Sequence, residues 1–189
     1  MQASTIVLLG VIGIIMGVNY YIKNRNVIEL KSSIDGRSYR IADGPDRQEA
    51  VDILASINSE IIKFVNYLRS NPDENIQRIC KNYNPDTFGE NLDYKSYQAY
   101  TVNKGSQVVI CIRDKDGKLI KDKNTLVFVM IHELSHIMTP QNGHPPIFWE
   151  NMGVLLKEAE KCGVYNVVDY SKTPVEFCGV LIDKTPYRF

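Results

Sequence analysis

The longest run of mainly apolar residues lies at the N-terminus of the chain, over residues 4–22. About 20 apolar residues are enough for a helix to cross a bilayer. Lys23 and Arg25 follow the run, and no basic residue precedes it, so the positive-inside rule places the rest of the chain on the cytosolic face. The pattern predicts a single-pass transmembrane anchor over residues 1–23, with residues 4–22 in contact with the lipid bilayer.

Beyond this run the pattern turns polar and then becomes periodic. Residues 24–44 carry scattered charge and two glycines, and we expect a linker there, with room for a short strand at 27–30. Apolar residues recur at helical spacing over 51–68, which predicts a core helix from 45 to about 70. A shorter helix is expected at 74–82.

The second half of the chain alternates between strand and helix patterns. The segments 96–102 and 107–113 are strand-like and are joined by an Asn-Lys-Gly turn, which predicts a hairpin. Residues 124–139 are apolar on most sides, and residues 147–162 show one apolar face before a glycine that can end a helix. These elements predict an α+β domain over residues 45–189.

All three histidines of the chain lie in one stretch of the predicted apolar helix and the turn after it. Residues four apart share a face of an α-helix, so His132 and His136 can bind one metal ion. Glu133 can reach the open coordination position and act as general base for a water molecule that the metal activates. Buried imidazole and carboxylate groups need a strong partner, and a metal ion is the expected one.

The turn after this helix can deliver a third ligand. Pro140 cannot continue the helix, Gly143 lets the chain turn back, and His144 follows as the expected third metal ligand. Glu150 and Glu158 on the next helix are the alternatives, since some zinc proteases use a downstream glutamate. The competing interpretation is that the motif arose by chance in a buried helix, and the confinement of every histidine to this stretch argues against it.

The segment His-Glu-Leu-Ser-His, with the later Gly-His-Pro-Pro-Ile-Phe-Trp, resembles the WLM and SprT-like zinc metalloproteases. The similarity covers roughly the last 90 residues, from Tyr97 onward. It is closest to small members carried by giant DNA viruses, in which a stretch similar to residues 169–179 recurs. The resemblance implies a zincin-like fold with Zn²⁺ as cofactor, zinc ligands at His132, His136 and His144, and a catalytic base at Glu133.

The chain departs from the family pattern in two respects. Seven residues separate His136 from His144, which is more than the common WLM spacing. No SUMO-binding tail or zinc finger is found before Phe189, so we do not extend to this chain the repair of DNA–protein crosslinks known for cellular relatives. Basic and acidic residues number 22 each, and this balance provides no clear signature for nucleic-acid binding.

The four cysteines do not form a Cys-x-x-Cys pair, which argues against a cysteine-zinc or thioredoxin-like site. We expect reduced, partly buried thiols, and the alternative is two disulfides in a lumenal domain. The residues concerned are Cys80, Cys111, Cys162 and Cys178.

These patterns predict a membrane-anchored zinc metallopeptidase that hydrolyses peptide bonds of a protein or peptide substrate. A free edge of the predicted hairpin could pair with an extended substrate. A tyrosine hydroxyl could stabilise the oxyanion, and Tyr165, Tyr170 and Tyr187 are equally open for that role. The alternatives are a non-catalytic, membrane-bound structural or virion scaffold protein that retains a zinc site, and a zinc hydrolase that does not act on peptides.

Overall fold

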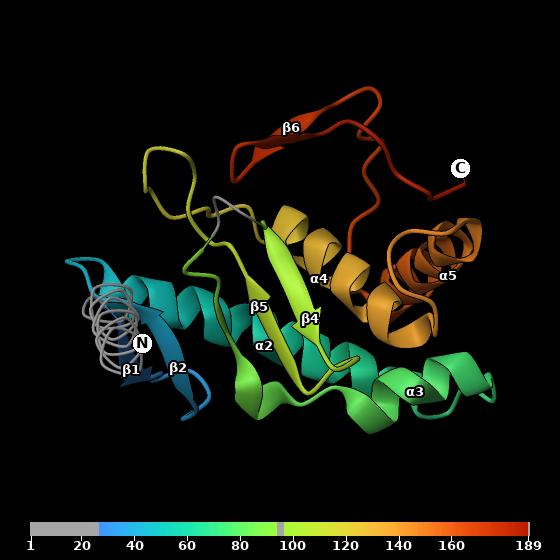
Figure 1. The fold of residues 1–189 in the computed structure, drawn as a ribbon, viewed down its shortest axis with the longest axis horizontal. Coiled ribbons are helices and arrows are strands. Elements are labelled where there is room, and N and C mark those ends of the chain that lie inside the picture. The colour runs from blue at the N-terminus through green and yellow to red at the C-terminus, as the bar shows by residue number, and fades with distance from the viewer. Residues whose placement is uncertain (1–26, 94–96, 189) are drawn as a thin grey trace, which may run out of the picture.

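The computed structural model describes residues 27–93 and 97–188 (Figure 1). Four α-helices and seven short strands make up this part of the chain. The helices are α2 (Arg47–Leu68), α3 (Glu74–Asn82), α4 (Lys123–Met138) and α5 (Pro146–Cys162), and a 3₁₀ turn covers Pro85–Thr87. The strands are β1 (Val27–Lys31), β2 (Ser38–Ala42), β3 (Phe88–Glu90), β4 (Ala99–Val102), β5 (Gln107–Ile110), β6 (Val175–Phe177) and β7 (Val180–Ile182).

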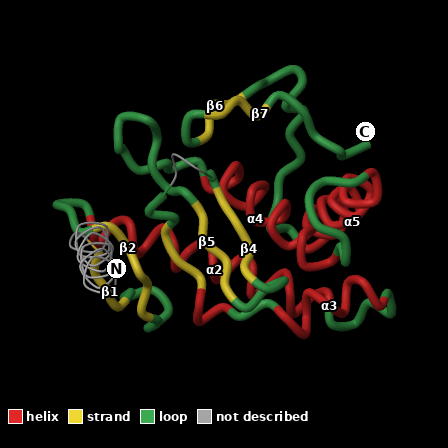
Figure 2. The backbone as a smooth tube through the Cα atoms, viewed as in Figure 1, coloured by secondary structure: helices red, strands yellow, loops and turns green. Residues whose placement is uncertain are grey.

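Helix α4 lies at the centre of the described domain and packs against α2, α3 and α5 and against strand β4 (Figure 2). Asp122 caps its first turn by accepting hydrogen bonds from the backbone N–H groups of Asn124 and Thr125. Twelve of its sixteen residues are buried, which agrees with the apolar pattern of its sequence. The helix ends at Met138, just before Pro140, as the sequence predicted.

The central sheet has the strand order β3-β5-β4, so β4 is an edge strand. Strand β5 pairs in parallel with β3 and antiparallel with β4, and the β4–β5 pair is the predicted hairpin. Asn103 and Lys104 in its turn have φ angles of 45° and 55°, as a type I′ turn requires. The edge position leaves the outer side of β4 without a partner strand among the described residues.

Residues 27–42 do not form the linker that their polarity predicted, although the short strand expected at 27–30 is present as β1. Strands β1 and β2 form an antiparallel hairpin that packs against α2, and Tyr39 and Ile41 of β2 are at most 1% exposed. The Tyr39 hydroxyl accepts a hydrogen bond from Asn58 Nδ2 at 2.9 Å. The hairpin therefore belongs to the packed domain, and the polar residues noted in the sequence form its exposed face.

None of the described helices combines the length and the apolar character needed to cross a bilayer. This finding corrects the predicted membrane-anchored architecture for the described part of the chain. Helix α2 has 22 residues but carries charges such as Asp52 and Lys63. The apolar α4 has 16 residues and is only about 24 Å long, against a hydrocarbon thickness of about 30 Å. The predicted anchor at residues 4–22 itself lies outside the described residues.

The predicted fold class, a zincin-like α+β domain behind a transmembrane helix, and the predicted single-pass localisation facing the cytosol are therefore cut back to what the described residues show. In their place, the described residues form a mixed α/β domain with four α-helices.

The C-terminal hairpin β6–β7 is attached to the domain by a disulfide bond between Cys111 and Cys178. Cys111 follows β5, and Cys178 lies in the turn between β6 and β7. The expectation of four reduced thiols is therefore wrong for this pair, while Cys80 and Cys162 are free. Sequence spacing could not reveal the pair, because 67 positions separate the two residues.

We predict that the disulfide contributes about 4 kcal/mol to the free energy of unfolding, because it closes a loop of 67 residues in the unfolded chain. Denaturant unfolding of Cys111→Ser under non-reducing conditions should show this loss, whereas the free Cys162→Ser should change stability by less than about 1 kcal/mol. Thiol labelling of the denatured, unreduced protein should modify Cys80 and Cys162 alone. Labelling of Cys111 and Cys178 as well would contradict the bond.

Candidate metal centre

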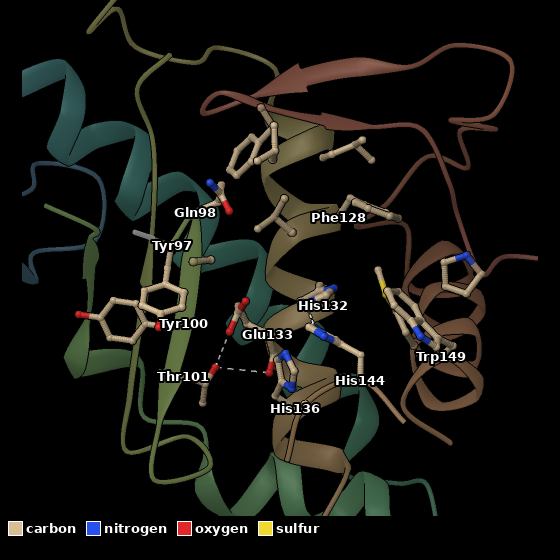
Figure 3. Close-up of a pocket in the computed structure, with 18 of the residues that line it drawn as sticks. Tyr97, Gln98, Tyr100, Thr101, Phe128, His132, Glu133, His136, His144 and Trp149 are labelled. Carbon is tan, nitrogen blue, oxygen red and sulfur yellow. Dashed lines mark hydrogen bonds between the residues drawn. The ribbon is translucent and has the colours of Figure 1, made fainter. Parts of the chain in front are cut away.

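The three histidines come together on one side of α4 (Figure 3). His132 and His136 project from successive turns of the helix, with ring centroids 5.0 Å apart. His144 reaches the same point from the following loop, and its Nε2 lies 3.0 Å from the Nε2 of His132. One potential ligand atom from each ring lies within 4.8 Å of the other two, so a single metal ion can contact all three.

The start of the loop that carries His144 is held by side chains from other elements. Lys104, in the β4–β5 turn, donates hydrogen bonds to the backbone carbonyls of Thr139 at 2.9 Å and Gln141 at 3.0 Å. Asn151 of α5 donates to the Thr139 hydroxyl at 2.9 Å. The two Lys104 contacts satisfy backbone carbonyls just after α4, and together with the Asn151 contact they fix the start of the loop.

Two aromatic residues at the start of α5 pack around the cluster. The ring centroid of Phe148 lies between 4.5 and 4.9 Å from those of all three histidines, and Phe148 is fully buried. Trp149 stacks on His144, with ring centroids 5.4 Å apart, and is 44% exposed. The imidazoles are thereby held between α4 and an aromatic surface.

Burial also determines the protonation state of the rings. Desolvation, followed by the proximity of the other histidines, lowers the pKa of His132 to about 3. Desolvation is the main cause of the lowered pKa of His136, about 4, and it also lowers the pKa of His144. All three imidazoles are therefore neutral near pH 7, which is the form that binds a metal ion.

Glu133 lies beside the cluster but is not part of it, since the group of potential ligands found in the described residues consists of the three histidines. Its side chain is 3% exposed, and its Oε2 accepts a hydrogen bond from the Thr101 hydroxyl at 2.8 Å. Desolvation raises the pKa of Glu133 to about 7, against a smaller lowering by the Thr101 hydrogen bond. This carboxyl group can therefore both accept and release a proton near neutral pH.

Thr101 reaches Glu133 because β4 and α4 run side by side in the same direction. Thr101 contacts Glu133, and Lys104 contacts Thr139. A strand rises about 3.3 Å per residue and a helix about 1.5 Å. The three residues from Thr101 to Lys104 therefore advance about as far as the six residues from Glu133 to Thr139, so both contacts can form. The sequence did not single out Thr101 or Lys104, because neither carries a motif and both act only through this packing.

A cavity of about 1190 Å³ opens in front of the cluster. His132, Glu133, His136 and His144 all line it, and Figure 3 shows them facing the space between β4 and α5. The catalytic and metal-binding candidates of the sequence thus share one cavity.

The alternative ligands and the candidate tyrosines lie elsewhere. The carboxylate of Glu158 accepts hydrogen bonds from Tyr67 and Lys161, and neither Glu158 nor Glu150 joins the described histidine cluster. None of the tyrosines proposed for the oxyanion lines the cavity. Tyr170 packs its buried ring on Phe128, with centroids 4.7 Å apart.

Comparison with known proteins found viral relatives. The chain is 30% identical over 161 residues to the uncharacterized protein R325 of Acanthamoeba polyphaga mimivirus, an alignment that covers 82% of each chain. Over 69 residues it is 39% identical to protein 042R of Invertebrate iridescent virus 3, and over 71 residues 34% identical to protein 136R of Invertebrate iridescent virus 6; each match covers 36% of this chain, and 43% and 39% of those proteins. No family profile and no solved structure matches the chain.

We predict that His144→Ala lowers the affinity for a divalent metal ion more than about 100-fold, since even residues that only support a ligand are worth about 10–100-fold. Calorimetric titration of the metal-free protein with Zn²⁺ or Co²⁺ measures this loss. Glu150→Ala and Glu158→Ala are the matched controls and should bind like the wild type. Normal binding by His144→Ala, with a loss in either glutamate variant, would assign the third ligand to a glutamate.

Proposed function

The chain belongs to the protein family that includes mimivirus R325, and we propose that it is a zinc-dependent metallopeptidase. The observation that carries the proposal is the pairing of three convergent imidazoles with a separate carboxyl group, Glu133, in one cavity. A tetrahedral zinc ion with Zn–N distances of about 2.0–2.1 Å holds its nitrogen ligands about 3.3 Å apart. The 3.0 Å between His132 and His144 is close to that spacing.

The histidines and the glutamate have different roles in this proposal. His132, His136 and His144 would hold the ion at the side of the cavity that they line. A bound Zn²⁺ supplies Lewis acidity and lowers the pKa of its water to about 7. Glu133, which is not needed as a ligand, would take a proton from the attacking water and deliver it to the leaving amine.

The burial of Glu133 favours catalysis over the alternative of a scaffold protein with a structural zinc site. Burying a carboxyl group costs free energy unless hydrogen bonds or a nearby cation compensate. Three histidines complete a protein ligand set without it, and a structural site gains nothing from a carboxyl group that does not bind the metal. A residue that accepts a proton during turnover explains its presence.

The edge strand β4 provides a place for a peptide substrate. Its outer side has no partner strand among the described residues, and its residues Ala99, Tyr100 and Thr101 line the cavity beside the histidines. A peptide that pairs with this edge in an extended conformation has its main chain held by hydrogen bonds. One of its carbonyl groups would then lie near the three histidines.

Glu133→Gln tests the assignment of the base. We expect peptide hydrolysis to fall by about 10²–10⁴-fold, since a positioned general base typically contributes that much, with zinc content and unfolding free energy nearly unchanged. The measurements are turnover of a quenched peptide mixture and zinc by atomic absorption on the same preparations. His132→Ala is the control that should lose both zinc and activity. Equal activity in Glu133→Gln and the wild type would remove the catalytic proposal and favour the scaffold.

Thr101 tests the positioning of that base. Thr101→Val removes the hydroxyl that donates to Glu133, and we expect kcat to fall about tenfold with little change in KM, because a hydrogen bond to a charged group is worth about 1.5–3 kcal/mol. Thr101→Ser keeps the donor and should restore most of kcat. Both variants should bind zinc normally. Equal kcat values for the two variants would show that the hydroxyl does not position Glu133.

A further inference from the structure

The cavity contains an apolar part that the histidines and Glu133 do not use. It begins one turn upstream of His132 on α4 and continues to the start of α5 and to the hairpin β6–β7. We call it the apolar subsite, and it consists of Phe128, Val129, Trp149, Met152, Phe177 and Leu181. None of these side chains is charged or can form an ion pair.

The apolar subsite has a buried floor and an exposed mouth. Phe128, Met152 and Phe177 are 6%, 1% and 1% exposed, whereas Trp149 is 44% and Leu181 is 62% exposed. Nine large apolar side chains are exposed among the described residues, and five of them line this one cavity. The five are Tyr97, Tyr100, Trp149, Val180 and Leu181. Such a concentration of exposed apolar surface in one place marks a binding site.

The hairpin that carries Leu181 is attached to the domain rather than loose. The disulfide between Cys111 and Cys178 joins its turn to the residue after β5, and Phe177 of β6 is buried in the core. Figure 1 shows the hairpin lying over α4, and its residues Phe177, Val180 and Leu181 line the cavity. Leu181 is therefore held at the mouth of the subsite while its side chain faces solvent.

From these observations, and resting on the proposed peptidase function, we propose that the apolar subsite binds a large apolar side chain of the substrate, next to the scissile bond. The preferred substrates are extended polypeptide segments with leucine, phenylalanine or methionine at that position. Along a peptide paired with β4, alternate side chains point to opposite faces, so one side chain can enter the space above Phe128. A charged side chain placed against Phe128, Met152 and Phe177 would lose its hydration, and none of these three side chains offers it a partner.

Trp149 offers a readout that does not depend on turnover, because it is the single tryptophan of the chain and lies in the subsite. The probes are short, blocked peptides without aromatic residues, identical except for one central residue, which is Leu, Ser or Asp. When the Leu peptide is added to the metal-free full-length protein, we expect the Trp149 fluorescence to change. The change should saturate at a peptide concentration about tenfold lower than with the Ser or Asp peptide, because one apolar group in a pocket typically contributes a factor of this size.

Two exposed apolar residues give a matched pair of variants. Leu181→Ser removes an apolar side chain from the mouth of the subsite, and Ile34→Ser removes one that is 55% exposed and does not line the cavity. Leu181→Ser should lose most of the preference for the Leu peptide, and Ile34→Ser should keep it. Equal binding of the three peptides, no fluorescence response to any of them, or equal preferences in the two variants would overturn the apolar subsite.

Cleavage by the zinc-loaded protein separates this inference from the proposed function. Mass spectrometry should place the cut beside Leu, with kcat/KM about tenfold above that for the Asp peptide. Cleavage of all peptides at equal rates would overturn the subsite and leave the peptidase function standing. Preferential binding of the Leu peptide without cleavage of any peptide would support the subsite and count against the peptidase function.

Discussion

The burial of α4 is the constraint on which the rest of the structure depends. Helices α2, α3 and α5 pack against it, and twelve of its sixteen residues are buried, so little of its surface is left for polar groups. His132, Glu133 and His136 occupy the part that faces the cavity. Imidazole and carboxyl groups in such a position require partners. For the carboxyl group of Glu133 the partner is the hydroxyl of Thr101, which lies on the neighbouring strand β4.

Residues from neighbouring elements hold the histidines in place. The turn of the β4–β5 hairpin fixes the His144 loop through Lys104, and Phe148 packs against all three imidazoles. A metal ion that enters such a site meets ligands already close to their bound positions, which lowers the conformational cost of binding. Glu133 is not part of the group of potential ligands.

The function proposed here rests on the site and not on the fold, since unrelated activities can share one architecture. The resemblance to WLM and SprT-like proteases is carried by the residues around the histidines and stays a prediction. The viral family is shown by a relative aligned over most of both chains. A buried carboxyl group beside three neutral imidazoles is the feature that sets a peptidase apart from a structural zinc protein.

The sequence by itself determined the helices and the histidine cluster, because helical periodicity, the Asp122 cap and the stop at Pro140 act within a few residues. It misjudged residues 27–42, where polar residues on one face of a hairpin read as a linker. Only the tertiary structure decided that Thr101 meets Glu133 and that Cys111 pairs with Cys178. These contacts join residues 32 and 67 positions apart. They depend on how whole elements pack, which no local pattern of apolar and polar residues encodes.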